Sequence, residues 1–246
     1  MGNTTRIYEK HVDIKKDTVQ EFWNKRAKKH IPENPYISVK CNDQNPDYVN
    51  TLDKYEKEII IPKLNITRNS NILDVGCGVG RLADDIASIC NYYLGTDFAE
   101  ELIAIAKKRF SNNDCDFQVC DFINILHDTK IKSKMPFNTI LLAGVAMYIN
   151  DDELKIALKN LLEILDEKAI IYMSEPIGIK KRLTLKEFYS KELNSEYNVI
   201  YRTIEEYKEI LKPLLDEGFK IIESKSFLTD ISQYSDTERH YFILKR

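Results

Sequence analysis

The stretch ILDVGCGVGRL, residues 72–82, decides the fold of this chain. Its apolar start belongs to a predicted strand, 71–75, and glycines follow at positions 76, 78 and 80. The 246-residue chain has only 8 glycines, so this concentration marks a turn at which the backbone approaches a ligand closely. The dinucleotide fingerprint requires glycine or alanine where Arg81 stands, so the NAD-type spacing fails.

Strands and helices alternate on both sides of this stretch. The predicted strands are 71–75, 92–96, 117–120, 137–143 and 169–173, and the predicted helices are 80–90, 99–110 and 151–165. Nearly continuous apolar strands joined by helices indicate a parallel sheet covered on both faces. Two further strands, 219–227 and 240–244, have a short connection without helical period and should run antiparallel to each other. We expect an α/β fold: a Rossmann-like three-layer sandwich around a mostly parallel seven-stranded sheet with an antiparallel last strand.

The chain divides into two predicted domains. Residues 1–69 carry two amphipathic helical patterns and should form a helical N-terminal lid, whereas residues 70–246 should form the main domain. A polar, tyrosine-rich insert, 176–203, precedes a helix that Thr203 and Glu206 would cap and Pro213 would interrupt.

Composition excludes several classes of protein. A net charge of −3 argues against a dedicated nucleic-acid binder, and no apolar run reaches the ~18 residues of a membrane span. Residues 1–17 lack the apolar core of a secretory signal. The five cysteines (Cys41, Cys77, Cys90, Cys115 and Cys120) show no C-x-x-C spacing, which argues against a disulfide framework and a structural zinc site. We therefore expect a reduced, cytoplasmic protein that is a monomer or a homodimer.

Acidic residues follow two of the predicted strands. Asp97 closes the second strand, 21 residues after Gly76, where an acid can accept hydrogen bonds from ribose hydroxyls. Asp121 and Phe122 follow the third strand, where they could bind and cover an adenine base. An acid at either position is also often a helix cap. The glycine loop, Asp97 and the Asp121–Phe122 pair nevertheless follow one another in order at strand ends, and this combination predicts a nucleotide-like cofactor.

These segments resemble the class I S-adenosylmethionine-dependent methyltransferases. The resemblance lies in residues 72–82, in GTDFAEELIAIAKKRF (95–110), in VCDF (119–122), in FNTILLAGVAMYI (137–149) and in the closing strand pair. EFWNKRAKKH (21–30) is similar to the lid helix of small-molecule members. One departure is Asp166-Glu167-Lys168, where the family often has a Gly-Gly turn.

The resemblance implies S-adenosylmethionine as cofactor, S-adenosylhomocysteine as product and a small-molecule methyl acceptor. It places the methionine end at Gly76–Gly80, the ribose at Asp97 and the adenine at Asp121 and Phe122. The cofactor-binding candidates are Asp74, Gly76, Cys77, Gly78, Gly80, Arg81, Asp97, Phe98, Asp121, Phe122, Ala143, Trp23 and Arg26.

The segment after the fourth strand bears on the acceptor. Residues 143–148 lack the Asn/Asp-Pro-Pro-aromatic tetrad of amino-methylating DNA enzymes, so nucleic acid is not the expected acceptor. Asp151 and Asp152 could be metal ligands by position, but capping of the next helix together with Asn150 is favoured. We expect no metal.

Base and acceptor residues are less defined by the sequence. The candidates for a general base are Glu175, His240 and Tyr148, and His30 is a weaker candidate. The alternatives are that the glutamate is a solvated acid, that the histidines lie at the surface and that the tyrosine packs in the core. The candidates for acceptor binding are Tyr36, Arg182, Tyr201 and Arg202. Tyrosines with cations suit a phosphorylated or otherwise anionic molecule, although a solvated charged face explains them as well.

The segment NPYISVKCNDQNPDY, residues 34–48, resembles small methyltransferases encoded with bacterial surface-polysaccharide genes. That resemblance implies O-methylation of a capsule precursor: a nucleotide-linked sugar, a phosphorylated sugar or a phosphoramidate. N-methylation of an amino sugar or another small amine is the alternative. A nucleotide-dependent oxidoreductase and a non-catalytic cofactor-binding module remain as alternatives of other classes.

Overall fold

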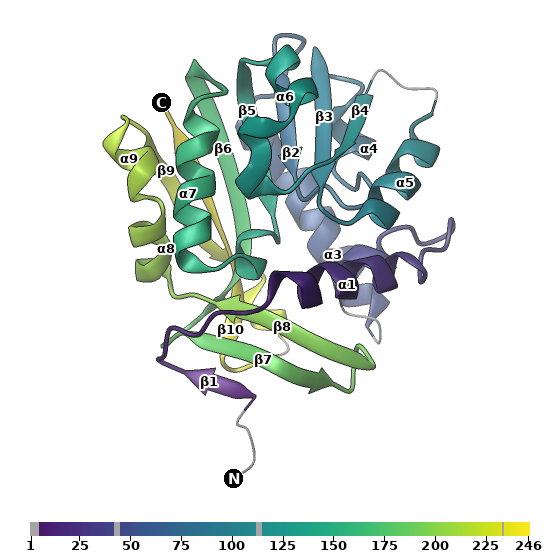
Figure 1. Cartoon of the computed structure of the whole chain (residues 1–246), viewed down its shortest axis with the longest axis vertical. Coiled ribbons are helices and arrows are strands. Elements are labelled where there is room, and N and C mark those ends of the chain that lie inside the picture. The colour runs from purple at the N-terminus through teal and green to yellow at the C-terminus, as the bar shows by residue number, and fades with distance from the viewer. Residues whose placement is uncertain (1–4, 42–44, 112–114, 233) are drawn as a thin grey trace.

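A seven-stranded sheet forms the centre of the computed structural model, which describes residues 5–41, 45–111, 115–232 and 234–246 (Figure 1). Its strand order is β4-β3-β2-β5-β6-β10-β9. β10 is antiparallel to both β6 and β9, whereas β2, β3, β4, β5 and β6 are parallel. The expected fold class is thereby confirmed. The strands are β2 (Asn71–Val75), β3 (Tyr92–Asp97), β4 (Cys115–Val119), β5 (Phe137–Ala143), β6 (Leu165–Gly178), β9 (Lys220–Phe227) and β10 (Thr237–Lys245).

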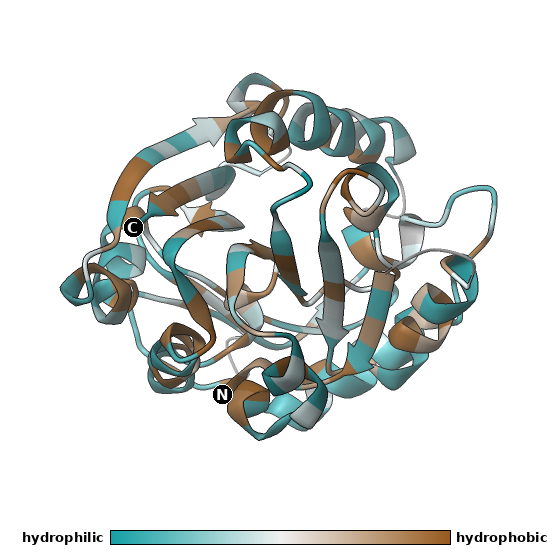
Figure 2. Ribbon diagram, turned by 90° about the horizontal axis from the view of Figure 1, so that it is seen from above, coloured by the Kyte–Doolittle hydropathy of each residue, from teal (hydrophilic) through white to brown (hydrophobic). Residues whose placement is uncertain are grey.

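Helices cover both faces of this sheet, and viewed from above they surround the strands (Figure 2). One face packs against η3 (Phe122–His127), α6 (Thr129–Lys134), α7 (Asp151–Leu162), α8 (Ile204–Ile210) and α9 (Lys212–Asp216). The other packs against α3 (Pro46–Tyr55), η1 (Glu56–Ile60), η2 (Ile61–Leu64), α4 (Ala83–Ile86) and α5 (Glu100–Arg109). Strand alternation divides β10 between the two cores, with Phe242 in the first and Tyr241 in the second.

A second, three-stranded sheet covers the ligand side of the fold. It consists of β1 (Arg6–Tyr8), β7 (Leu183–Ser190) and β8 (Ser195–Tyr201), all antiparallel. It packs with α1 (Lys16–Ala27) and η4 (Ala146–Tyr148) around a third apolar cluster. The lid therefore combines β1 and α1 of the N-terminal segment with the 176–203 insert, whereas α3, η1 and η2 of the expected lid, residues 1–69, pack against the main sheet.

Local signals in the sequence succeeded to different degrees. The capping box of Thr203 and Glu206 is confirmed, and the helix it starts is divided at Leu211, with Pro213 in the first turn of α9. The predicted helix 80–90 is an α-helix only over α4, because the chain before it turns through the left-handed glycines. The remaining short helical segments are α2 (Ile37–Lys40) and η5 (Thr229–Ile231). Residues 42–44 of the polysaccharide-type segment lie outside the described residues.

Candidate active site

A cavity of about 650 Å³ lies between the sheet and the lid. The carboxyl ends of β2, β3, β5 and β6 contribute to its floor, and residues of α1, β7 and β8 contribute to its roof. Open α/β sheets bind their ligands at this end of the strands, and the volume falls within the usual range for small-molecule sites, about 300–1,000 Å³.

The glycine loop after β2 lines the cavity with backbone. Gly76 and Gly78 have φ values of +69° and +57°, which L side chains rarely adopt. A Cβ added to Gly76 would lie 2.3 Å from Val145, and one added to Gly78 would lie 2.7 Å from Val39. Gly80 differs, because its close neighbour is Phe110 in the apolar core rather than the cavity. All three glycines are therefore required by close packing, the first two against valine side chains that line the cavity and the third against the apolar core.

Asp97 ties this loop to the end of β3. Its carboxylate accepts hydrogen bonds from the N–H of Gly78 (3.0 Å) and from the N–H of Ala99 (2.9 Å). Burial raises the pKa of Asp97 to about 6, while these N–H donors oppose the shift. Each carboxylate oxygen has a second lone pair, so Asp97 still has acceptor capacity for a ligand's hydroxyl groups.

The segments after β4 and β5 continue the cavity wall. Asp121 accepts from the N–H of Ile123 and forms an ion pair with Lys16, and all three residues line the cavity with Phe122. Gly144 has a φ of +78°, and a Cβ added there would meet no atom within 4 Å. A side chain at that position would therefore project into open cavity space.

A buried charge cluster supports the floor beneath the loop. Arg81 is ion-paired with Asp53 and Glu56, at 2.7 Å in both cases. Asp74 accepts a hydrogen bond from the Tyr93 hydroxyl at 2.5 Å, and burial raises the pKa of Asp74 to about 7. Arg81 and Asp74 both line the cavity, so the two charged ends of the loop motif are held in place by neighbours from other elements.

The structure brings together most of the cofactor-binding residues expected from the sequence. Gly80 and Arg26 are the exceptions, since neither lines the cavity. The Nε of Arg26 donates to the Ser38 carbonyl at 3.0 Å inside the lid. The residues that do line it are Asp74, Gly76, Cys77, Gly78, Arg81, Asp97, Phe98, Asp121, Phe122, Ala143 and Trp23.

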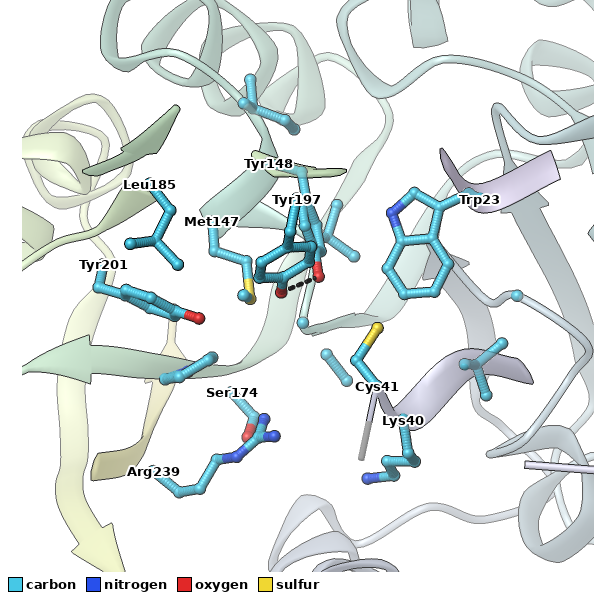
Figure 3. A pocket seen from close by; sticks show the side chains of 18 of the residues that line it. Trp23, Lys40, Cys41, Met147, Tyr148, Ser174, Leu185, Tyr197, Tyr201 and Arg239 are labelled. Atoms are coloured by element: carbon cyan, nitrogen blue, oxygen red, sulfur yellow. Dashed lines mark hydrogen bonds between the residues drawn. The ribbon is translucent and has the colours of Figure 1, made fainter. Parts of the chain in front are cut away.

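Beyond the glycine loop the cavity opens into a chamber lined by aromatic side chains (Figure 3). The Tyr148 and Tyr197 hydroxyls are hydrogen-bonded at 2.7 Å, and Trp23 packs edge-on against Tyr148 at 5.3 Å between ring centroids. Tyr201, a candidate for acceptor binding from the sequence, also lines the chamber. Sequence reasoning missed Tyr197. Its signal is the four-residue spacing from Tyr201, which puts both rings on one face of β8 once 195–201 is recognised as a strand.

Two of the three candidate bases face away from the chamber. Glu175 is fully buried and accepts from the N–H groups of Val145 (2.9 Å), Ala146 (2.8 Å) and Met147 (3.3 Å). Burial raises the pKa of Glu175 to about 7, against the pull of those donors. Its neighbours Ser174 and Pro176 line the cavity, as strand alternation requires, and Glu175 does not. Glu175 therefore braces the loop after β5.

Of the remaining candidate bases, the two histidines lie outside the cavity lining and the tyrosine lies within it. His240 is hydrogen-bonded to Ser224 (2.8 Å) and Ser226 (2.9 Å) on β9, and burial lowers its pKa to about 4. His240 and His30 do not line the cavity, whereas Tyr148 does. Burial raises the pKa of Tyr148 well above its ordinary value, so its hydroxyl is suited to donating or accepting a hydrogen bond rather than to ionising.

The sequence suggested that Arg182, Arg202 and Tyr36 bind the acceptor, but none of these three residues lines the chamber. Asp151 holds both arginines, at 3.0 Å from Arg182 and 2.7 Å from Arg202, and both side chains are buried outside the cavity lining. The Tyr36 hydroxyl donates to Asp84 at 2.5 Å on the outside of the lid. Asp151 thus acts as an ion-pair centre and not as a helix cap, because its carboxylate is directed at the two arginines.

Comparison with known proteins agrees with this site. Residues 72–168 match the family model described as a methyltransferase domain. Phosphoethanolamine N-methyltransferase 1 of Caenorhabditis elegans is 21% identical over 168 residues, which cover 67% of this chain and 32% of that protein. This chain thus spans about a third of the length of that curated relative.

Solved structures show the same fold. Phosphoethanolamine N-methyltransferase 1 of Haemonchus contortus, in complex with phosphoethanolamine and S-adenosylhomocysteine, aligns with a TM-score of 0.72 at 22% identity, covering 94% of this chain and 48% of that one. Magnesium protoporphyrin IX methyltransferase from Synechocystis PCC 6803 with bound SAH aligns with a TM-score of 0.62 at 14% identity. The alignment covers 94% of this chain and 100% of that one.

The strand order and the glycine loop agree with the fold of these S-adenosylhomocysteine-bound methyltransferase structures and with the family match. Residues 72–168 of this chain are thus similar to a methyltransferase domain. The cavity fits the cofactor, because Gly76 and Gly78 line it with backbone and Asp97 retains acceptor capacity beside them. In the described part of the chain, no group of three or more His, Cys, Asp or Glu side chains could hold a metal ion. None of the described helices is long and apolar enough to cross a membrane.

Proposed function

We propose that the protein methylates a small anionic metabolite in the cytoplasm, as a monomer or homodimer. The specific reaction we propose is O-methylation of a phosphorylated, nucleotide-linked or phosphoramidate precursor in capsule or surface-polysaccharide biosynthesis. The observation that carries the proposal is one cavity, lined at one end by the glycine loop and Asp97 and at the other by Tyr148, Tyr197 and Tyr201. When bound, S-adenosylmethionine supplies an electrophilic methyl group on a sulfonium.

The protein's own contribution is alignment and exclusion of water. Trp23, Tyr148 and Tyr197 form a wall of packed rings, and the three-stranded sheet of the lid covers the chamber. Holding the acceptor atom in line and stripping its hydration are the main rate contributions available to a direct transfer. The Tyr148–Tyr197 hydroxyl pair can orient an acceptor by hydrogen bonding.

The position of the candidate bases supports an acceptor that arrives already deprotonated. A neutral hydroxyl acceptor needs a general base within hydrogen-bond reach, and Glu175 and His240 are both directed elsewhere. An anionic phosphoryl or phosphoramidate oxygen needs no proton removed. This favours a phosphoramidate-type oxygen over a sugar hydroxyl among the precursors we consider.

N-methylation of a small amine is the second candidate. It is supported by the likeness to phosphoethanolamine N-methyltransferases. It is also supported by the aromatic wall of Trp23, Tyr148 and Tyr197, because ring faces attract ammonium groups. An amine acceptor requires only that its nitrogen be held neutral at the moment of transfer.

Calorimetric titration with S-adenosylmethionine and S-adenosylhomocysteine tests the cofactor first. We expect micromolar binding of both and no binding of NADH. Assays of S-adenosylhomocysteine release with phosphoramidate, sugar phosphates, nucleotide sugars and phosphoethanolamine then separate the acceptors. Binding without turnover on any of them would favour a non-catalytic module, and binding of NADH alone would favour an oxidoreductase.

A further inference from the structure

Two cationic side chains converge in the chamber from opposite walls. Lys40 ends α2 in the lid and Arg239 lies on β10 in the sheet, and both line the cavity. Figure 3 shows their side chains pointing toward one another across the chamber, below the tyrosine pair. These cations were not among the site residues that the sequence predicted.

Arg239 is directed into the cavity by strand alternation. His240, its neighbour on β10, bonds Ser226 of β9 and does not line the cavity, so Arg239, one position before it, points to the opposite face of the strand. Arg239 therefore faces the side on which its register partner Pro176 lines the chamber. Among the described residues, the half-buried guanidinium of Arg239 has no hydrogen bond or ion pair.

The acids that line this half of the cavity are engaged by other groups. Asp236 binds Arg6 at 2.9 Å. Glu238 accepts from Ser226 at 2.5 Å, and Glu192 accepts from Tyr234 at 2.6 Å. The charge of Arg239 is thus left to the cavity, where a bound anion would be its first ionic partner.

Lys40 brings a second positive charge to the same space. Its Nζ lies 3.3 Å from Glu56, a carboxylate that Arg81 also binds. Burial lowers the pKa of Lys40 to about 8, with the charges of Arg81 and Arg239 lowering it further and Glu56 opposing them. Two cations that repel each other in a buried space are stabilised when an anion lies between them.

We propose that Arg239 and Lys40 form the subsite for a doubly charged phosphoryl group of the methyl acceptor. This rests on the proposed function, since it names the part of the acceptor that the chamber recognises. The guanidinium fork can bind two phosphoryl oxygens at once, and the ammonium adds a point charge from the opposite side. Arg239 lies on β10 opposite Pro176 of β6, whereas Asp97 ends β3 and Asp121 follows β4 at the other end of the sheet. The pair therefore belongs to the acceptor and not to the adenosyl end of the cofactor.

Titration of the full chain with inorganic phosphate, with S-adenosylhomocysteine saturating, tests the subsite. We expect phosphate to bind, and R239Q and K40M each to weaken its binding at least tenfold. R239K keeps the charge but loses the fork, so it should recover part of the affinity. Lys191→Gln is the control matched for charge, because Lys191 is an exposed cation on the cavity rim, and it should change phosphate binding less than twofold.

The outcomes distinguish failure of the subsite from failure of the proposed function. Binding of S-adenosylhomocysteine without binding of phosphate overturns the subsite alone, whereas loss of both overturns the proposed function. Two results would assign the pair to the cofactor's carboxylate instead. One is displacement of S-adenosylhomocysteine by phosphate, and the other is a loss of S-adenosylhomocysteine affinity in R239Q as large as the loss of phosphate affinity. Acetate binding as tightly as phosphate would contradict a doubly charged group. R239Q remains decisive if K40M fails to fold, because Arg239 has no partner to lose.

Discussion

Asp97 lies at the end of the cavity where we expect the cofactor to bind. One carboxylate holds the N–H of Gly78 in the glycine loop and the N–H of Ala99 at the start of α5. The same group faces the cavity. We therefore expect Asp97 to act on ligand binding both by accepting hydrogen bonds directly and by positioning the loop.

We predict that Asp97→Asn weakens S-adenosylhomocysteine binding at least tenfold, about 1.4 kcal/mol, while the chain stays folded. Asparagine keeps the size of the side chain but replaces one acceptor oxygen with a donor. Calorimetry measures the affinity, and circular dichroism checks the fold. Asp128→Asn is the matched control, because Asp128 also accepts a backbone N–H, from Ile131 at 2.9 Å, but lies outside the cavity lining. Equal affinity of Asp97→Asn and the unmodified chain would remove Asp97 from the cofactor site.

Residues at strand ends could be placed from the sequence, and residues inside strands could not. Asp97 and Asp121 were found because a parallel sheet brings its carboxyl ends together. Glu175 was misplaced because the strand expected to end at residue 173 continues to Gly178. Inside a strand, a shift of one position turns a side chain to the opposite face, so Glu175 braces a loop instead of facing the acceptor.

At the scale of elements, Asp151 joins three segments of the lid. It starts α7 and binds Arg182 before β7 and Arg202 after β8. It also accepts from His11, between β1 and α1, at 2.8 Å. The pairing of these segments could not be read from sequence, because Arg182 and Arg202 are 31 and 51 positions from Asp151. Spacing rules for helices and strands act only over a few residues.

We predict that Asp151→Asn lowers the free energy of unfolding by about 3 kcal/mol, because it leaves two buried guanidinium groups without their shared carboxylate. Urea denaturation measures the loss. Limited trypsin digestion should show faster cleavage within the 176–203 insert. Asp152→Asn, one position along α7 and exposed, is the control and should change stability little. If both variants denature at the same urea concentration, Asp151 does not hold the lid.

At the scale of the whole molecule, buried carboxylates of two kinds set the response to pH. Burial raises the pKa of Asp74, Asp97 and Glu175 to about 7, 6 and 7. Each of these groups keeps its proton in the folded chain at pH values where the unfolded chain has lost it. Their contribution to stability is therefore complete below about pH 4 and is lost as the pH rises through 6 to 7.

Glu56 and His240 act in the opposite direction. Burial alone would raise the pKa of Glu56, but Arg81 and Lys40 outweigh it and hold the value near 2. Its stabilisation is present above about pH 4.5 and is lost as the pH falls toward 2. Burial lowers the pKa of His240 to about 4, so this group favours folding increasingly as the pH rises from about 4 to 6.5.

Stability of the ligand-free chain should therefore reach its maximum near pH 4 and decline toward pH 7, since three carboxylates lose their contribution in that interval and only one histidine gains. Thermal unfolding midpoints measured from pH 4 to 8 provide the profile. Glu175→Gln removes one of the three declining groups, so it should flatten the fall between pH 5 and 7. His240→Gln removes the group that opposes this fall, so the midpoint should fall more steeply between pH 5 and 7. Each variant serves as a control for the other, because the two should change the slope of the midpoint against pH in opposite directions. A midpoint that rises steadily to pH 7 in the unmodified chain would show that these carboxylates are ionised in the folded state, as their N–H and hydroxyl donors favour, and that burial does not dominate them.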